Sequence, residues 1–158
     1  MMPASLPKPD FPIDPQILTA SAPQSLDQLN YQASINLLEW QLQRNVYEAE
    51  RLVFELTQKL EALEAQMAFR HQVWQRCLHS WNDNGGLEWY YYRDSMLAGV
   101  DNLHYDVAEL DAVIVAIDVF VINYWPGVTM ELLYHAGEIQ SRGNELSFRI
   151  RQLLFPRD

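Results

Sequence analysis

The chain has 158 residues, 49% hydrophobic and 20% charged, which is typical of a folded globular domain and excludes a wholly disordered chain. Its net charge of −10 argues against nucleic acid and anionic membrane surfaces as partners, because both are bound mainly through Lys and Arg. The single cysteine, Cys77, cannot form an intrachain disulfide and fits a reducing compartment. The most apolar run, 112–125, is shorter than the roughly 20 residues of a membrane span, and the first residues lack a signal-peptide pattern, so we expect a soluble, cytoplasmic protein.

Residues 1–24 contain six of the eight prolines, which disfavour regular structure because proline lacks a backbone donor and restricts its neighbours. This composition predicts a flexible arm. Extended proline-rich segments also dock in grooves, so an arm that binds this protein or a partner is the alternative.

Residues 25–81 contain neither Gly nor Pro and predict one very long, coiled-coil-like helix. Ser25 and Gln28 have the spacing of a capping box at its start. Apolar residues then recur at alternating steps of three and four, at Val46, Ala49, Val53, Leu56, Leu60, Leu63 and Met67. Further Leu residues widen this stripe, so the pattern favours a bundle of three or more helices over a bare two-stranded coil.

The run Asn-Asp-Asn-Gly-Gly over 82–86 predicts the end of the long helix and a turn. The aromatic residues that follow predict a short helix or an ordered loop, within a turn segment over 82–100. Trp and Tyr often dominate the energetics of protein interfaces, so this segment is the candidate partner-binding surface, although the same residues could form a hydrophobic plug. The candidates are Trp81, Trp89, Tyr90, Tyr91, Tyr92 and Arg93.

Two shorter helices are predicted over 101–125 and 128–155, the second with Thr129 as its N-cap. Their apolar residues keep the same steps of three and four, although the β-branched residues of 112–122 leave a strand as the alternative there. We therefore expect a single all-α domain over 25–158, an antiparallel helical bundle with one very long N-terminal helix. Because that helix is more than twice as long as the others, its surplus apolar stripe predicts a homodimer.

Four polar residues on the shorter helices form a possible buried polar or ligand site: His104, Asp111, Asp118 and His135. Asp118 is the one charged residue in the apolar run, so we expect it to be paired or hydrogen-bonded. A structural pair is the simpler explanation, and a metal or acid–base site is the alternative. The Glu-x-x-His pattern of di-iron bundles is missing from the sequence, and no metal, cofactor or catalytic residue is predicted.

The sequence favours a non-catalytic protein–protein interaction module, an adaptor, scaffold or assembly factor, that acts as a homo-oligomer through its long helix. One alternative is a helical-bundle enzyme or ligand-binding protein that uses the four polar residues. Another alternative follows from the composition of residues 82–126, which contain eight acidic residues and one Arg. Such a segment could act as an acidic decoy of a nucleic-acid-binding protein.

Overall fold

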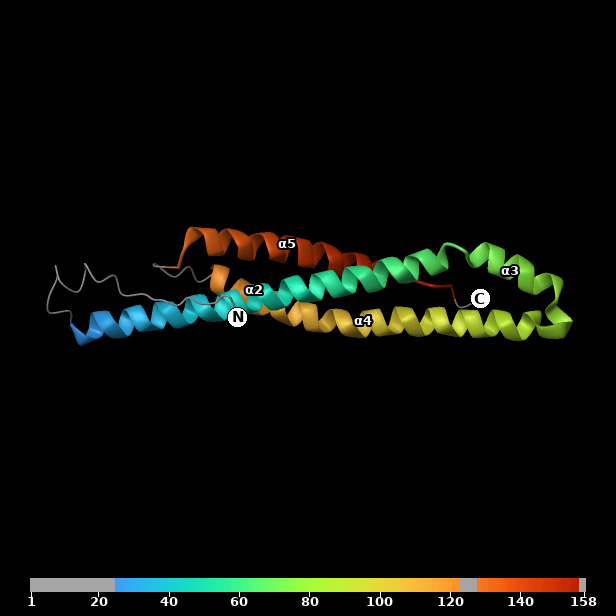
Figure 1. The fold of residues 1–158 in the computed structure, drawn as a ribbon, viewed down its shortest axis with the longest axis horizontal. Coiled ribbons are helices and arrows are strands. Elements are labelled where there is room, and N and C mark those ends of the chain that lie inside the picture. The colour runs from blue at the N-terminus through green and yellow to red at the C-terminus, as the bar shows by residue number, and fades with distance from the viewer. Residues whose placement is uncertain (1–24, 123–127, 157–158) are drawn as a thin grey trace. The chain divides into compact units, whose positions relative to one another are not determined.

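The computed structural model describes residues 25–122 and 128–156, and the predicted arm over 1–24 lies outside these ranges. The described residues form helices and no strand, which confirms the all-α bundle with a long N-terminal helix (Figure 1). The elements are α2 (Leu26–Met67), α3 (Arg70–His79), a π-helical turn η1 (Trp81–Gly85), α4 (Gly86–Ile122) and α5 (Met130–Gln152). None of the described helices is long and apolar enough to cross a membrane.

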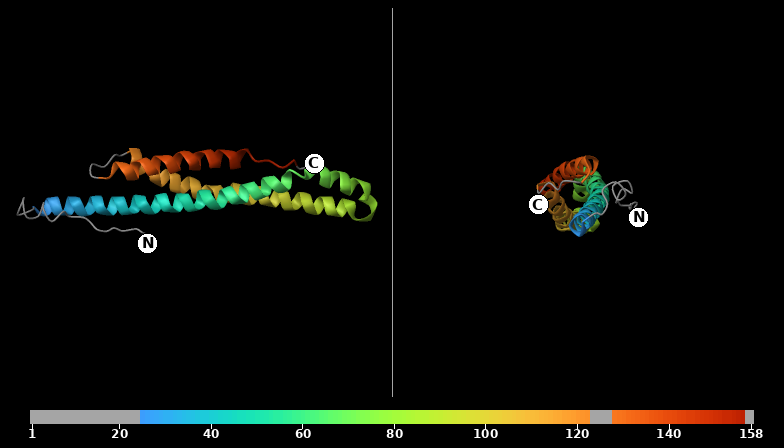
Figure 2. Two further views of the ribbon diagram at one scale, coloured as in Figure 1. Left: turned by 45° about the horizontal axis from the view of Figure 1, so that its top comes forward. Right: turned by 90° about the vertical axis from the view of Figure 1, so that its left-hand side faces the viewer.

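The described residues form two compact units, and each unit contains part of α2, α4 and α5. The first comprises the described residues of 25–50 and 113–141, and the second those of 51–112 and 142–156. Within each unit, α4 runs in the opposite direction to α2 and α5 (Figure 1, Figure 2). The single domain over 25–158 stays a prediction.

The core of each unit is built from one apolar stripe of each helix, and burying these stripes is the main source of stability. In the first unit the buried residues include Ile35, Leu42, Val46, Ala49, Ile114, Ile117, Ala136 and Ile139. In the second they include Leu52, Val53, Leu56, Leu60, Leu63, Val100, Leu103, Val107, Leu110, Leu146 and Ile150. The stripe predicted from the sequence is therefore confirmed from Val46 to Leu63.

Local sequence signals define two helix starts. In the predicted capping box, the Gln28 amide donates to Ser25 Oγ at 3.0 Å and the Ser25 amide donates to Gln28 Oε1 at 3.2 Å. At the start of α5, the Thr129 hydroxyl accepts from the Leu132 amide at 3.4 Å, while the Glu39 carboxylate accepts from the Thr129 amide at 2.9 Å. These bonds satisfy amides that the first turn of a helix leaves unpaired.

The unbroken helix predicted over 25–81 is wrong, because α2 ends at Met67 and α3 begins at Arg70. At the break the Phe69 amide donates to the Gln66 carbonyl at 3.3 Å, a three-residue spacing tighter than that of an α-helix. The Tyr92 hydroxyl donates to the same carbonyl at 3.0 Å. A tertiary contact thus accompanies the break, and neither Gly nor Pro marks it.

The turn segment predicted over 82–100 is too long, since α4 begins at Gly86 and includes the aromatic residues that follow. The chain reverses at Ser80 and η1, where the Gly85 amide donates to the Ser80 carbonyl at 2.8 Å. A Cβ atom on Gly85 would lie 2.0 Å from the Cys77 carbonyl oxygen, so this close backbone approach requires glycine. The Asn-Asp-Asn-Gly-Gly signal is confirmed, but as a π-helical turn.

The two later helices also differ in length from the predicted 101–125 and 128–155. Helix α4 starts 15 residues earlier, because residues with strand propensity become helical when their rings pack into a core. Helix α5 is shorter at both ends, since Thr129 serves as its cap and the chain leaves the helix after Gln152. Residues 123–127, between the two helices, lie outside the described residues.

Candidate protein-interaction surface

Part of the predicted aromatic surface is buried and belongs to the hydrophobic core. Trp89 is only 5% exposed, and its ring lies edge-on to Trp74, with centroids 4.9 Å apart. The contacts continue from Trp74 to Trp81 at 5.8 Å, from Trp89 to Tyr92 at 5.7 Å, and from Tyr92 to Phe155 at 5.9 Å. This aromatic cluster joins α3, η1, α4 and the segment after α5, and such ring pairs add stability beyond area burial alone.

Arg70 is held inside this aromatic cluster. Its guanidinium carbon lies 5.6 Å from the ring centroid of Trp89 and 5.4 Å from that of Phe155. Its Nε atom is buried and has no hydrogen-bond partner among the described residues. A guanidinium group tolerates this setting because it is weakly hydrated and is attracted to aromatic faces. The position of Arg70 between aromatic rings was not predicted from the sequence.

The exposed part of the predicted surface lies at the start of α4. Tyr91 is 80% exposed and Leu87 is 72% exposed. They line an open hollow of about 380 Å³, together with Asn84, Glu88 and Tyr92. The six candidates therefore divide into the buried Trp89, the half-buried Trp81, Tyr92 and Arg93, and the exposed Tyr90 and Tyr91.

Arg93 is positioned by its neighbours in the sequence. Its guanidinium carbon lies 5.0 Å from the ring centroid of Tyr90, and its Nη2 atom lies 3.6 Å from Asp94 Oδ1. These contacts hold a positive charge against the ring of Tyr90.

In the second unit, two of the four polar candidates have structural partners. Asp111 accepts a hydrogen bond from Ser147 Oγ at 2.8 Å and forms an ion pair with Arg151. His104 Nε2 lies 2.9 Å from the carbonyl oxygen of Ile150, to which it donates. That carbonyl lies in the last turn of α5 and also accepts from the Leu153 amide at 3.1 Å.

In the first unit, Asp118 accepts a hydrogen bond from Gln140 Nε2 at 3.1 Å, so it is hydrogen-bonded as expected, with an amide as its partner. His135 is exposed, with its ring 6.4 Å from that of Tyr134. No hydrogen bond or ion pair in the described ranges joins two of the four candidates. Among the same residues no three His, Cys, Asp or Glu side chains converge on a metal position.

Cys77 is fully buried, and its thiol donates a hydrogen bond to Glu88 Oε1 at 3.4 Å. Burial, reinforced by the hydrogen bond and the negative charge of Glu88, raises the pKa of the Cys77 thiol, while the nearby charge of Arg76 lowers it by less. The thiol is therefore protonated at neutral pH, as expected for a structural cysteine.

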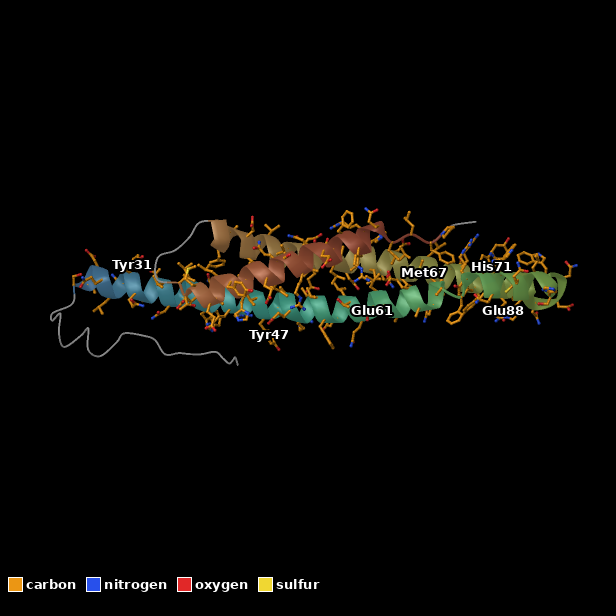
Figure 3. The ribbon with its side chains drawn as sticks, turned by 90° about the horizontal axis from the view of Figure 1, so that it is seen from above. Tyr31, Tyr47, Glu61, Met67, His71 and Glu88 are labelled. Atoms are coloured by element: carbon orange, nitrogen blue, oxygen red, sulfur yellow. The ribbon has the colours of Figure 1, made fainter. Side chains whose placement is uncertain are left out.

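A second apolar stripe on α2 was missed by the sequence reasoning. In the first unit Leu26, Leu37, Trp40 and Tyr47 are exposed on this helix, and Figure 3 shows Tyr47 projecting outward from it. The guanidinium carbon of Arg44 lies 5.1 Å from the ring centroid of Trp40, within the same stripe. The signal was the seven-residue spacing of Leu26, Ala33, Trp40 and Tyr47, which repeats outside the core positions.

No protein-family model, curated protein or solved structure matches this chain.

Proposed function

We propose that this protein is a non-catalytic protein–protein interaction module, a scaffold or adaptor, that forms a homodimer through the outer stripe of α2. The outer stripe consists of Leu26, Ala33, Leu37, Trp40, Arg44 and Tyr47. The observation that carries the proposal is that Trp40 and Tyr47 are 44% and 69% exposed on a helix whose opposite side is core. The buried thiol of Cys77 is compatible with the cytoplasm as the location.

The two stripes of α2 face opposite sides of the helix. Each residue of an α-helix is rotated by about 100° from the one before it, so Trp40 and the buried Leu42 point in nearly opposite directions. The same relation holds for Tyr47 and the buried Ala49. A contiguous apolar stripe on the surface marks an interaction site more often than scattered single residues do.

The charges along the outer stripe favour a second copy of this chain as the occupant. Arg44 lies within the stripe, and Glu48 and Glu50 lie beside it on the same helix. In an antiparallel pair of α2 helices, the Arg of one copy can approach the Glu residues of the other. Opposite charges that flank an apolar seam specify both partner and orientation.

The test is the mass of the full chain in solution, measured by sedimentation equilibrium. We expect a dimer for the natural protein and a monomer for the double variant Trp40→Glu, Tyr47→Glu, because buried carboxylates without partners oppose association. The matched control is Tyr134→Glu, which changes an exposed Tyr of α5 and should leave the dimer intact. A natural protein that is monomeric at micromolar concentration, or a double variant that still dimerises, would contradict the proposal.

A further inference from the structure

Helix α4 has an outer stripe of its own in the second unit. Leu87, Tyr91, Ala98, Tyr105, Ala108 and Ala112 are exposed and recur at steps of three, four or seven. The buried residues Trp89, Met96, Leu103 and Leu110 follow a seven-residue spacing that starts two positions after Leu87. Since two residues correspond to about 200° of helix rotation, this stripe faces away from the core of the unit.

The hollow at the start of α4 lies on this stripe. Leu87 and Tyr91, one helical turn apart, form part of its wall, and Asn84 and Glu88 add polar atoms. The hollow, of about 380 Å³, is open to solvent, so a side chain of a partner helix can reach it. Pockets of this kind accept the anchor residues that dominate binding energy in protein interfaces. Beyond Tyr91 the small Ala98 lets a partner backbone approach closely.

The exposed charges that α4 itself carries along its outer stripe are acidic, and Arg76 and Lys59, on other helices, are ion-paired with Glu88 and Asp106. Asp94, Asp101 and Glu109 are exposed there, and Asp101 and Glu109 form no ion pair with any described residue. The one Lys or Arg between Leu87 and Ala112 is Arg93, whose guanidinium lies over Tyr90. Two copies of this stripe would therefore repel each other, whereas a basic partner would be attracted.

We propose that the outer stripe of α4 binds a basic amphipathic helix of a different protein. The apolar side of that helix packs on Leu87, Tyr91 and Tyr105, with one large side chain in the hollow. Its Lys and Arg side chains approach Asp94, Asp101 and Glu109. This is the common mode in which an amphipathic helix lies on an apolar groove. The proposal shares the general idea of an interaction module, but it uses a different helix from the α2 dimer, and either can fail alone.

The experiment titrates the full chain with two synthetic helical peptides of about three heptads. Both have Leu at the seam positions and no Trp, and they differ only in carrying Lys or Glu at the flanking positions. Binding is measured by calorimetry and by the intrinsic fluorescence of the protein, since Trp89 packs against Tyr92, which lines the hollow. We expect the Lys peptide to bind, and the Glu peptide to bind at least about tenfold more weakly. Added salt should lower the affinity of the Lys peptide.

Two matched variants locate the site. Ala98→Arg places a long basic side chain in the middle of the α4 stripe, and Ala62→Arg makes the same change at an exposed position of α2 in the same unit. We expect Ala98→Arg to lower the affinity for the Lys peptide at least about tenfold, and Ala62→Arg to change this affinity less than about twofold. Circular dichroism of both variants verifies that they fold.

Three results would overturn the proposal. Equal binding of the two peptides would mean that charge does not select the partner. An equal loss of affinity in Ala98→Arg and Ala62→Arg would mean that the Lys peptide binds through the net charge of the protein and not at this stripe. A natural dimer that dissociates in Ala98→Arg would identify a second copy of the chain, and not a basic helix, as the occupant. The dimer test with Trp40→Glu, Tyr47→Glu has a separate readout.

Discussion

The hydroxyl group of Tyr92, on α4, donates a hydrogen bond to the backbone carbonyl of Gln66, 3.0 Å away in the last turn of α2. The carbonyls of a last turn have no partner within their own helix, so this bond satisfies one of them from outside. The neighbouring Phe69 amide donates to the same oxygen. The contact therefore links the end of one helix to the side of another at the point where the predicted long helix breaks.

Removing that hydroxyl should destabilise the fold by a measurable amount. We expect Tyr92→Phe to lower the free energy of unfolding by up to about 1 kcal/mol, because the Gln66 carbonyl then keeps only the Phe69 amide as a donor. Tyr91→Phe is the control, since Tyr91 is exposed and has no hydrogen bond with a described residue, and it should have no effect. Urea denaturation followed by circular dichroism measures both. Equal stability of the two variants would mean that the hydrogen bond does not contribute.

Truncating two nearby aromatic residues of α4 should change the stability of the protein by very different amounts. Trp89→Ala should destabilise the protein by about 3–5 kcal/mol, because it leaves a cavity beside Trp74 and removes one of the rings that cover Arg70. Tyr91→Ala should change stability by less than about 0.5 kcal/mol, as is usual for an exposed side chain. Denaturant titration distinguishes these values, and a Trp89→Ala protein of natural stability would contradict the assignment of Trp89 to the core.

The raised pKa of Cys77 predicts that stability declines in mild alkali. A thiol that holds its proton more tightly when folded contributes fully below the ordinary cysteine pKa of about 8.5, and this contribution is lost as the pH rises through the raised folded-state pKa. We expect the free energy of unfolding to fall as the pH rises above about 8.5, and to fall less in Cys77→Ala.

The pH slope, and not the absolute stability, is the readout, because Cys77→Ala also removes buried volume. The same burial predicts that a thiol reagent labels the folded protein at neutral pH much more slowly than the unfolded protein. Identical slopes for the natural protein and the variant would show that Cys77 does not titrate as proposed.

Two glycines should respond in opposite directions to the same substitution. Gly85→Ala would place a Cβ atom 2.0 Å from the Cys77 carbonyl oxygen, so we expect η1 to distort and the protein to lose more than about 2 kcal/mol. Gly137→Ala, on α5, meets no heavy atom within 4 Å, so it should stabilise the helix by about 0.5–1 kcal/mol. Thermal denaturation compares the two, and a Gly85→Ala protein as stable as Gly137→Ala would contradict the tight turn.

The features predicted correctly from the sequence depend on residues that are close to one another along the chain. The capping box at Ser25, the cap at Thr129 and the apolar stripe through Leu56 are set by spacings of three or four residues. The break after Met67 could not be predicted in this way, because neither Gly nor Pro marks it and its tertiary contact comes from Tyr92, 26 positions from Gln66. No local sequence signal marks a carbonyl that will be bonded by a distant hydroxyl.

The candidate surface was predicted only in part, because residue type does not determine exposure. Trp89 and Tyr91 have the same interface propensity, yet one is buried and the other exposed. The heptad position would have separated them, since Trp89 lies seven residues before Met96 and fourteen before Leu103, both core positions. The outer stripe of α2 was not predicted for the related reason that residue type does not distinguish a second, exposed apolar face from a wider core face.

The pair of contacts that α4 makes with helix ends has a consequence for cooperativity. Tyr92 bonds the last turn of α2, and His104 bonds the carbonyl of Ile150 in the last turn of α5. If α4 detaches, both last turns lose a partner at the same time and fray. In native-state hydrogen exchange, the ends of these two helices should therefore open together with the adjoining turns of α4, as one foldon whose parts are distant in sequence.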